Sequence, residues 1–99
     1  MIQRQGIRFS LEGPVTVGNV RKTLAEGLAE IEAGALEVDL GKLSVVDSSA
    51  IGMMLEWMRA AKERKQSLSF FGINQELASL ARLYGLENLI PQGEANSPK

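Results

Sequence analysis

An aspartate followed by two serines, Asp47-Ser48-Ser49, stands after an expected strand, where the longest helical pattern of the chain begins. Unpaired backbone N–H groups and the positive end of the helix dipole gather at the first turn of a helix, so this position favours a negative group. Asp47 is expected to cap the helix, and the two hydroxyls either help to start it or contact a partner. A hydroxyl here could also accept a phosphate, which would change the local charge.

The other residue types restrict the chemistry that this position can perform. The chain contains no His, the commonest general base and metal ligand, and no Cys. Ser48 therefore has no imidazole to activate it, and the sequence has no Gly-rich phosphate-binding loop. Asp39 and Asp47 could share a cation, but no further acids cluster beside them. We therefore expect no catalytic residues, no metal site, no cofactor and no enzymatic activity.

Composition and charge exclude several kinds of partner. A formal net charge of −1 over 99 residues gives no general attraction to nucleic acid or to anionic lipid. No window approaches the roughly 18 consecutive apolar residues of a membrane span. The first five residues lack the apolar core of a signal peptide. We expect a cytoplasmic protein that binds no nucleic acid and does not insert into a membrane.

The hydropathy pattern predicts strands and helices in the order β-β-α-β-α-β-α, with a possible last short strand at Leu89-Ile90. Alternating residues predict a short strand near residues 2–4 and strands at 7–12, 36–40 and 68–71, with Gly13-Pro14 ending the second. Helical spacing predicts helices at 19–32, 48–65 and 74–84. We expect one domain over residues 1–91 and a flexible polar tail over residues 92–99.

The alternation of apolar and polar residues in the strands indicates a sheet with one face toward water and helices stacked on the other. The fold class is therefore α/β with helices on one face. Asn19 or Thr16 could cap the first helix. Gly27 lies inside that helix, where it costs roughly 1 kcal/mol relative to Ala, so close packing against a neighbour is expected there.

The second helix is more apolar than one sheet contact requires. Its apolar arc covers roughly 220°, whereas a surface helix needs roughly 100° to face its core. Neighbouring helices could cover the excess. Alternatively, Met53 and Trp57 remain partly exposed as a docking patch beside Ser48, because Trp is frequent among binding hot spots and Met adapts to partner surfaces. Such a patch could also drive a weak homodimer.

The stretch Asp47-Ser48-Ser49-Ala50-Ile51-Gly52, after an apolar strand and before a long apolar helix, resembles the STAS domain family of anti-sigma-factor antagonists and sulfate-transporter tails. The family motif is close to Asp-Ser-Ser-Gly-Leu-Gly, and the resemblance covers most of residues 2–90. It implies a STAS-like mixed sheet. In antagonists of the family the phosphorylated serine follows the Asp, which implies Ser48 as phosphoacceptor or partner contact. The partner surface is then the start and exposed side of this helix, with Asp47, Ser49, Met53, Trp57 and Thr16 as interface residues.

A narrower resemblance joins the chain to the MlaB-like STAS subunits of Mla-type phospholipid ABC transporters. It is carried by the segment Leu80-Ala81-Arg82-Leu83-Tyr84-Gly85-Leu86 and by the hydroxyl of Ser48, where those subunits carry Thr. The resemblance implies a subunit that docks on the cytoplasmic ATPase, and so reaches the inner face of the inner membrane through its partner.

The alternative is an anti-sigma-factor antagonist that a serine kinase switches by phosphorylation. Antagonists of the family carry an Asp where this chain has Thr16, within Leu11-Glu12-Gly13-Pro14-Val15-Thr16. An anti-sigma kinase that uses this Asp would lose a charge contact, which favours the transporter subunit over the sigma regulator.

Overall fold

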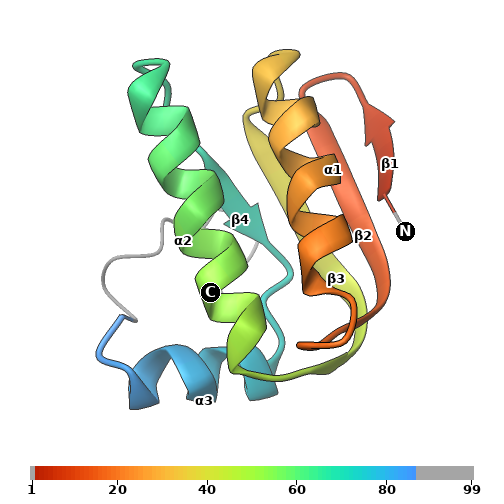
Figure 1. Cartoon of the computed structure of the whole chain (residues 1–99), viewed down its shortest axis with the longest axis vertical. Helices are drawn as coiled ribbons and strands as arrows, with labels where there is room; N and C mark the ends of the chain where they lie inside the picture. The colour runs from red at the N-terminus through yellow and green to blue at the C-terminus, as the bar shows by residue number, and fades with distance from the viewer. Residues whose placement is uncertain (1, 87–99) are drawn as a thin grey trace.

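The computed structural model describes residues 2–86, which form a four-stranded sheet and three helices (Figure 1). The elements follow the predicted order: β1 (Ile2–Gln5), β2 (Arg8–Val15), α1 (Val20–Glu32), β3 (Glu37–Val46), α2 (Ser48–Glu63), β4 (Ser69–Phe71) and α3 (Gln75–Leu83). The strands lie in the spatial order β1-β2-β3-β4, with β1 antiparallel to β2 and the other neighbours parallel. The possible strand at residues 89–90 and the tail at 92–99 lie outside the described residues.

Helices α1 and α2 lie side by side on one face of the sheet, and α3 crosses below the start of α2 (Figure 1). Phe9 and Leu11 of β2 point into this layer and are fully buried. The alternate residue Arg8 lies on the other face, where its guanidinium stands 4.1 Å from the ring centre of Phe71 and pairs with Glu37 at 3.1 Å. The predicted helical layer on one face is therefore confirmed.

Strand β2 is longer than the sequence predicted. It continues through Gly13 and Pro14 to Val15. Its register against β3 shifts on either side of Gly13, whose φ is +89°, so Pro14 fits into the strand at an irregularity of the ladder. The consequence is that Val15 pairs with Val46 at the end of β3, directly before the Asp47-Ser48-Ser49 turn.

The excess apolar surface of α2 is covered by α1. Trp57 is fully buried, its ring meets Phe9 edge to face at a centroid distance of 5.3 Å, and its Nε1–H donates to the Leu24 carbonyl of α1 at 3.0 Å. A Cβ at Gly27 would overlap the indole ring, so the glycine lets α1 approach Trp57 closely. The predicted close packing at Gly27 is confirmed.

The predicted docking patch of Met53 and Trp57 is wrong. Met53 is 2% exposed and Trp57 is 0% exposed, so neither side chain can contact a partner on the folded domain. The physical reason is that Gly27 removes a side chain from α1 where the indole needs room. The width of the apolar arc of α2 reflects contacts with both the sheet and α1.

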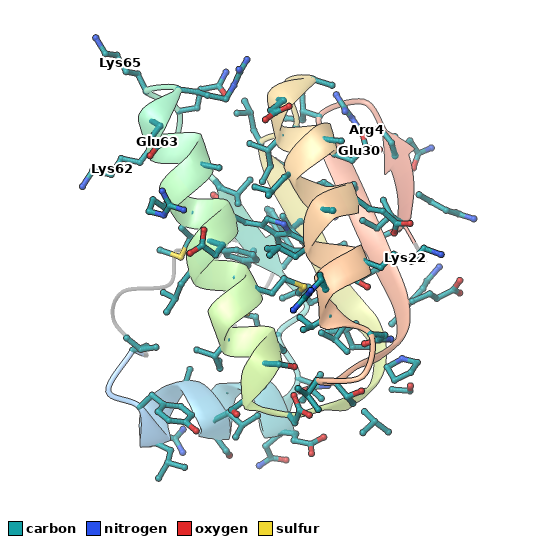
Figure 2. The ribbon with its side chains drawn as sticks, in the orientation of Figure 1. Arg4, Lys22, Glu30, Lys62, Glu63 and Lys65 are labelled. Atoms are coloured by element: carbon teal, nitrogen blue, oxygen red, sulfur yellow. The ribbon has the colours of Figure 1, made fainter. Side chains whose placement is uncertain are left out.

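A side chain from the edge strand closes the end of α1. Figure 2 shows Arg4 of β1 beside Glu30 of α1, and the two pair at 2.8 Å. The same guanidinium donates to the Glu30 carbonyl at 3.3 Å and to the Ala33 carbonyl at 3.4 Å. A cation at the carboxyl end of a helix complements both the unpaired carbonyls and the dipole.

Within residues 2–86, no helix combines the length and apolar character that crossing a bilayer requires.

Candidate functional site

The turn between β3 and α2 is held by the end of β2. Asp47 has an extended backbone, and its N–H donates to the Val15 carbonyl at 3.3 Å. One carboxylate oxygen, Oδ1, accepts from the Ser49 N–H at 2.9 Å, which is the predicted cap of α2. The other, Oδ2, accepts from the Val17 N–H at 3.0 Å. Asp47 therefore joins the start of α2 to the loop between β2 and α1.

Asp47 is ionised at neutral pH. The Ser49 hydroxyl donates to its carboxylate and is the largest cause that lowers the pKa of Asp47 below its usual value of 3.8. The backbone N–H groups of Val17 and Ser49 lower the pKa further, against a small desolvation effect. Hydrogen bonds to a carboxylate stabilise its charged form, so the start of α2 carries a fixed negative charge.

We expect Asp47→Asn to lower stability fully above about pH 4 and progressively less as the pH falls below it. The folded pKa of Asp47 lies below the unfolded value, so its stabilisation is present above the unfolded pKa and disappears as the pH falls through the folded pKa. Thermal unfolding of both proteins between pH 2 and 7 checks this. The two melting curves should converge at low pH; a difference that stays constant across the range would show that the charge contributes nothing.

The two serines of the turn have different environments. The Ser49 hydroxyl is engaged with Asp47, and Ser49 is half-buried. Ser48 is exposed, and its hydroxyl has no hydrogen-bond partner within residues 2–86. Of the two hydroxyls, that of Ser48 is therefore the one that is exposed and not engaged within the described residues.

Ser48 lies between two hollows of the surface. The first, of about 760 Å³, separates the start of α2 from α3; we call it the Ser48 groove, and it is lined by Val46, Asp47, Ser48, Glu76, Ser79, Leu80, Leu83 and Tyr84. The second, of about 440 Å³, lies along the exposed side of α2 and includes Ser48, Gly52, Leu55 and Tyr84. Ser48 and Tyr84 therefore belong to both hollows.

The apolar surface beside Ser48 comes from α3 and its end, which the sequence interpretation did not identify. Leu83 is 74% exposed and Tyr84 is 52% exposed. The spacing of residues in the sequence could have shown that Leu83 is exposed. Leu83 follows Glu76 and Ser79 at seven and four residues, so it shares a helix face with polar side chains rather than with buried Leu77.

Thr16 is placed near this site but does not face the groove as a lining residue. It lies in the loop after β2, its N–H donates to Asn19 Oδ1 at 2.9 Å, and its carbonyl accepts from the Val20 N–H at 2.9 Å. Asn19 stands at the N-cap of α1 without a side-chain cap bond, because its amide bonds back to Thr16 and Pro14. Asp47, Ser48, Ser49 and Thr16 are thus brought together, and Met53 and Trp57 are not part of this surface.

The described residues form no group of three or more acidic, His or Cys side chains that could hold a metal ion. The site offers instead an exposed hydroxyl, a fixed carboxylate and exposed apolar side chains. These groups are suited to contacts with another macromolecule.

Comparison with known proteins assigns the chain to a family. A family model described as "Mlab, STAS domain" matches residues 2–91. The anti-sigma-B factor antagonist of Listeria monocytogenes is 29% identical over 69 residues, which cover 66% of this chain and 60% of the relative. The same protein from Listeria innocua matches equally. The chain therefore aligns with less than two thirds of the length of these relatives.

Solved structures share the fold. The anti-sigma factor antagonist SpoIIAA in its unphosphorylated form superposes with a TM-score of 0.72 at 18% identity, over 94% of this chain and 86% of that one. The phosphorylated form of SpoIIAA from Bacillus gives a TM-score of 0.66, over 94% and 89% of the two chains, at 18% identity. A sulfate transporter family protein from Wolinella succinogenes gives 0.66 at 20% identity, over 90% and 72%.

Proposed function

Because this chain belongs to the STAS domain family, we propose that it is a regulatory module without catalytic activity that binds another protein through Ser48 and the Ser48 groove. The observation that carries the proposal is the environment of Ser48. Its hydroxyl is exposed and lacks a partner within residues 2–86, while Asp47 and Ser49 beside it are locked in hydrogen bonds. Exposed Leu83 and Tyr84 supply apolar surface next to it.

The partner in this proposal is the cytoplasmic ATPase subunit of an Mla-type phospholipid ABC transporter. Two features support it: the description of the matching family model, and the resemblance of residues 80–86 to the MlaB-like subunits. The same segment carries Leu83 and Tyr84 of the Ser48 groove, so the resemblance falls on the surface available for docking. The module would then act in the cytoplasm, at the inner membrane through its partner.

The second candidate is an anti-sigma-factor antagonist. It is favoured by the Listeria relatives and by the SpoIIAA structures. The exposed Ser48 hydroxyl would be the group that a kinase phosphorylates. Thr16, in place of the family's Asp, is engaged through its backbone in the loop before α1 and brings no charge to a kinase partner.

We expect Ser48→Asp to weaken ATPase binding at least tenfold, about 1.4 kcal/mol, while the melting temperature stays unchanged. The new side chain is larger than the hydroxyl, cannot donate a hydrogen bond to the partner, and must lose its hydration at the contact. Ser48→Ala should fold normally, since surface changes without lost bonds cost less than about 0.5 kcal/mol. Titration calorimetry against the purified ATPase, with urea unfolding of each variant, measures both quantities.

Ser67 provides the matched control for this experiment. It is exposed in the loop after α2, and Figure 2 shows Lys62 and Lys65, which flank that end of the helix, far from its start. Ser67→Asp should leave ATPase affinity within twofold of the unmodified protein. Equal affinities for Ser48→Asp and Ser67→Asp would remove Ser48 from the binding surface.

The two candidates are separated by incubation with ATP and each partner. A transporter ATPase should bind without modifying the chain. An anti-sigma kinase should add one phosphate, seen by mass spectrometry in the unmodified protein and absent from Ser48→Ala. Phosphate transfer, with no binding to the ATPase, would establish the second candidate.

A further inference from the structure

The Ser48 groove combines apolar surface with negative charge. Its apolar part comes from Val46, Leu80, Leu83 and Tyr84, of which Leu83 is the most exposed. Two of its lining residues, Asp47 and Glu76, are carboxylates, and none of its described lining residues is a Lys or Arg. An apolar surface with an acidic rim selects its occupant by charge as well as by shape.

The fold places both acidic residues at the starts of helices, and it also holds the carboxylate of Asp47 in position. Asp47 is fixed by the N–H groups of Ser49 and Val17. Glu76 lies in the first turn of α3, whose start is capped by Asn74 Oδ1 accepting from the Leu77 N–H at 2.7 Å. Negative charge at the start of a helix is favourable, and here two helix starts present it to one groove.

We propose that the Ser48 groove receives a segment of the partner that carries an apolar side chain next to a lysine or arginine. The apolar side chain packs against Leu83 and Tyr84, and the cation lies between Asp47 and Glu76. This inference rests on the proposed function and adds to it the chemistry of the segment that the partner must supply.

The charge of the groove does not match the charge of residues 87–99. Residues 87–99 carry Glu87 and Glu94 and one cation, Lys99, the last residue of the sequence. A segment with more acid than base would bring like charges to the carboxylates of the groove. A basic and apolar segment of another protein matches the groove in both respects.

The test measures ATPase affinity for Glu76→Lys and Leu83→Ser at low and high salt. Glu76→Lys should weaken binding at least tenfold at low ionic strength, and the loss should shrink as salt screens the charge. Leu83→Ser should weaken binding tenfold at both ionic strengths, since its contact is apolar. Glu32→Lys is the matched control, because it makes the same charge change at an exposed residue that ends α1, at the opposite end of the molecule from α3 (Figure 1), and it should stay within twofold.

Each outcome decides one question. If Ser48→Asp weakens binding while Glu76→Lys and Leu83→Ser bind like the unmodified protein, the groove proposal is overturned, and of the proposed function the docking of the ATPase through Ser48 remains. If the ATPase binds none of the proteins, the proposed function fails and the inference fails with it. If sedimentation of the protein alone shows a dimer that Leu83→Ser separates, the groove belongs to a second copy and the proposal is overturned.

Discussion

Trp57→Ala is expected to lower the free energy of unfolding by about 4 kcal/mol, as full burial of a large aromatic side chain implies. The substitution removes the indole that joins α2 to α1, its edge-to-face contact with Phe9 and its hydrogen bond to the Leu24 carbonyl. Since domains of this size are stable by about 5–15 kcal/mol, the variant should be close to unfolding at physiological temperature. Urea unfolding followed by circular dichroism measures the loss.

Trp57→Phe is the matched control for this substitution. It keeps an aromatic ring beside Phe9 but removes the N–H that donates to Leu24. The cost should be about 2 kcal/mol, from the lost hydrogen bond and a smaller cavity. If Trp57→Ala unfolds like the original protein but no longer binds the ATPase, the burial account fails and Trp57 belongs to the partner surface.

Gly27→Ala is expected to destabilise the protein by about 3 kcal/mol, at the upper end of the usual cost of overpacking. Helix propensity alone would predict the opposite change in stability, because it favours Ala over Gly by about 1 kcal/mol inside a helix. The added Cβ would overlap the buried Trp57 ring, so α1 would have to move away from α2 and weaken the bond to Leu24. Urea unfolding again provides the measurement.

Gly52→Ala is the control that separates the cost of overpacking from the gain in helix propensity. Gly52 is also in the interior of a helix, α2, but it is exposed, and a Cβ there would have no atom within 4 Å. Gly52→Ala should therefore stabilise the protein by about 1 kcal/mol. The opposite signs at the two glycines are the expected result; stabilisation at both positions would show that α1 and α2 are not in close contact.

The fold could be predicted because its local signals agree with its packing. The cap of α2 by Asp47 lies where the sequence predicted it. Helix α3 starts after its cap, Asn74, and is followed by a left-handed glycine, Gly85 at φ +71°, close to the predicted bounds of 74–84. Each is a contact between residues a few positions apart. The predicted end of β2 was wrong. Pro14 fits into the strand only because the register against β3 shifts there, and β3 is far away in sequence.

The candidate site was predicted in part, for the same reason. The roles of Asp47 and Ser49 follow from local hydrogen bonds at the start of a helix. Whether Trp57 is exposed depends on how closely α1 approaches α2, and a helical wheel of α2 contains no information on α1. Leu83 and Tyr84 became part of the site only when α3 was placed across the start of α2 (Figure 1).

Thiol labelling tests most directly whether the chain binds its partner through the start of α2. The protein has no Cys, so Ser48→Cys and Ser10→Cys each introduce a single reactive group, the first beside the Ser48 groove and the second on the open face of the sheet. We predict that saturating ATPase slows maleimide modification at position 48 at least tenfold and leaves position 10 unchanged. Protection at position 10, with position 48 as reactive as in the free protein, would contradict the account.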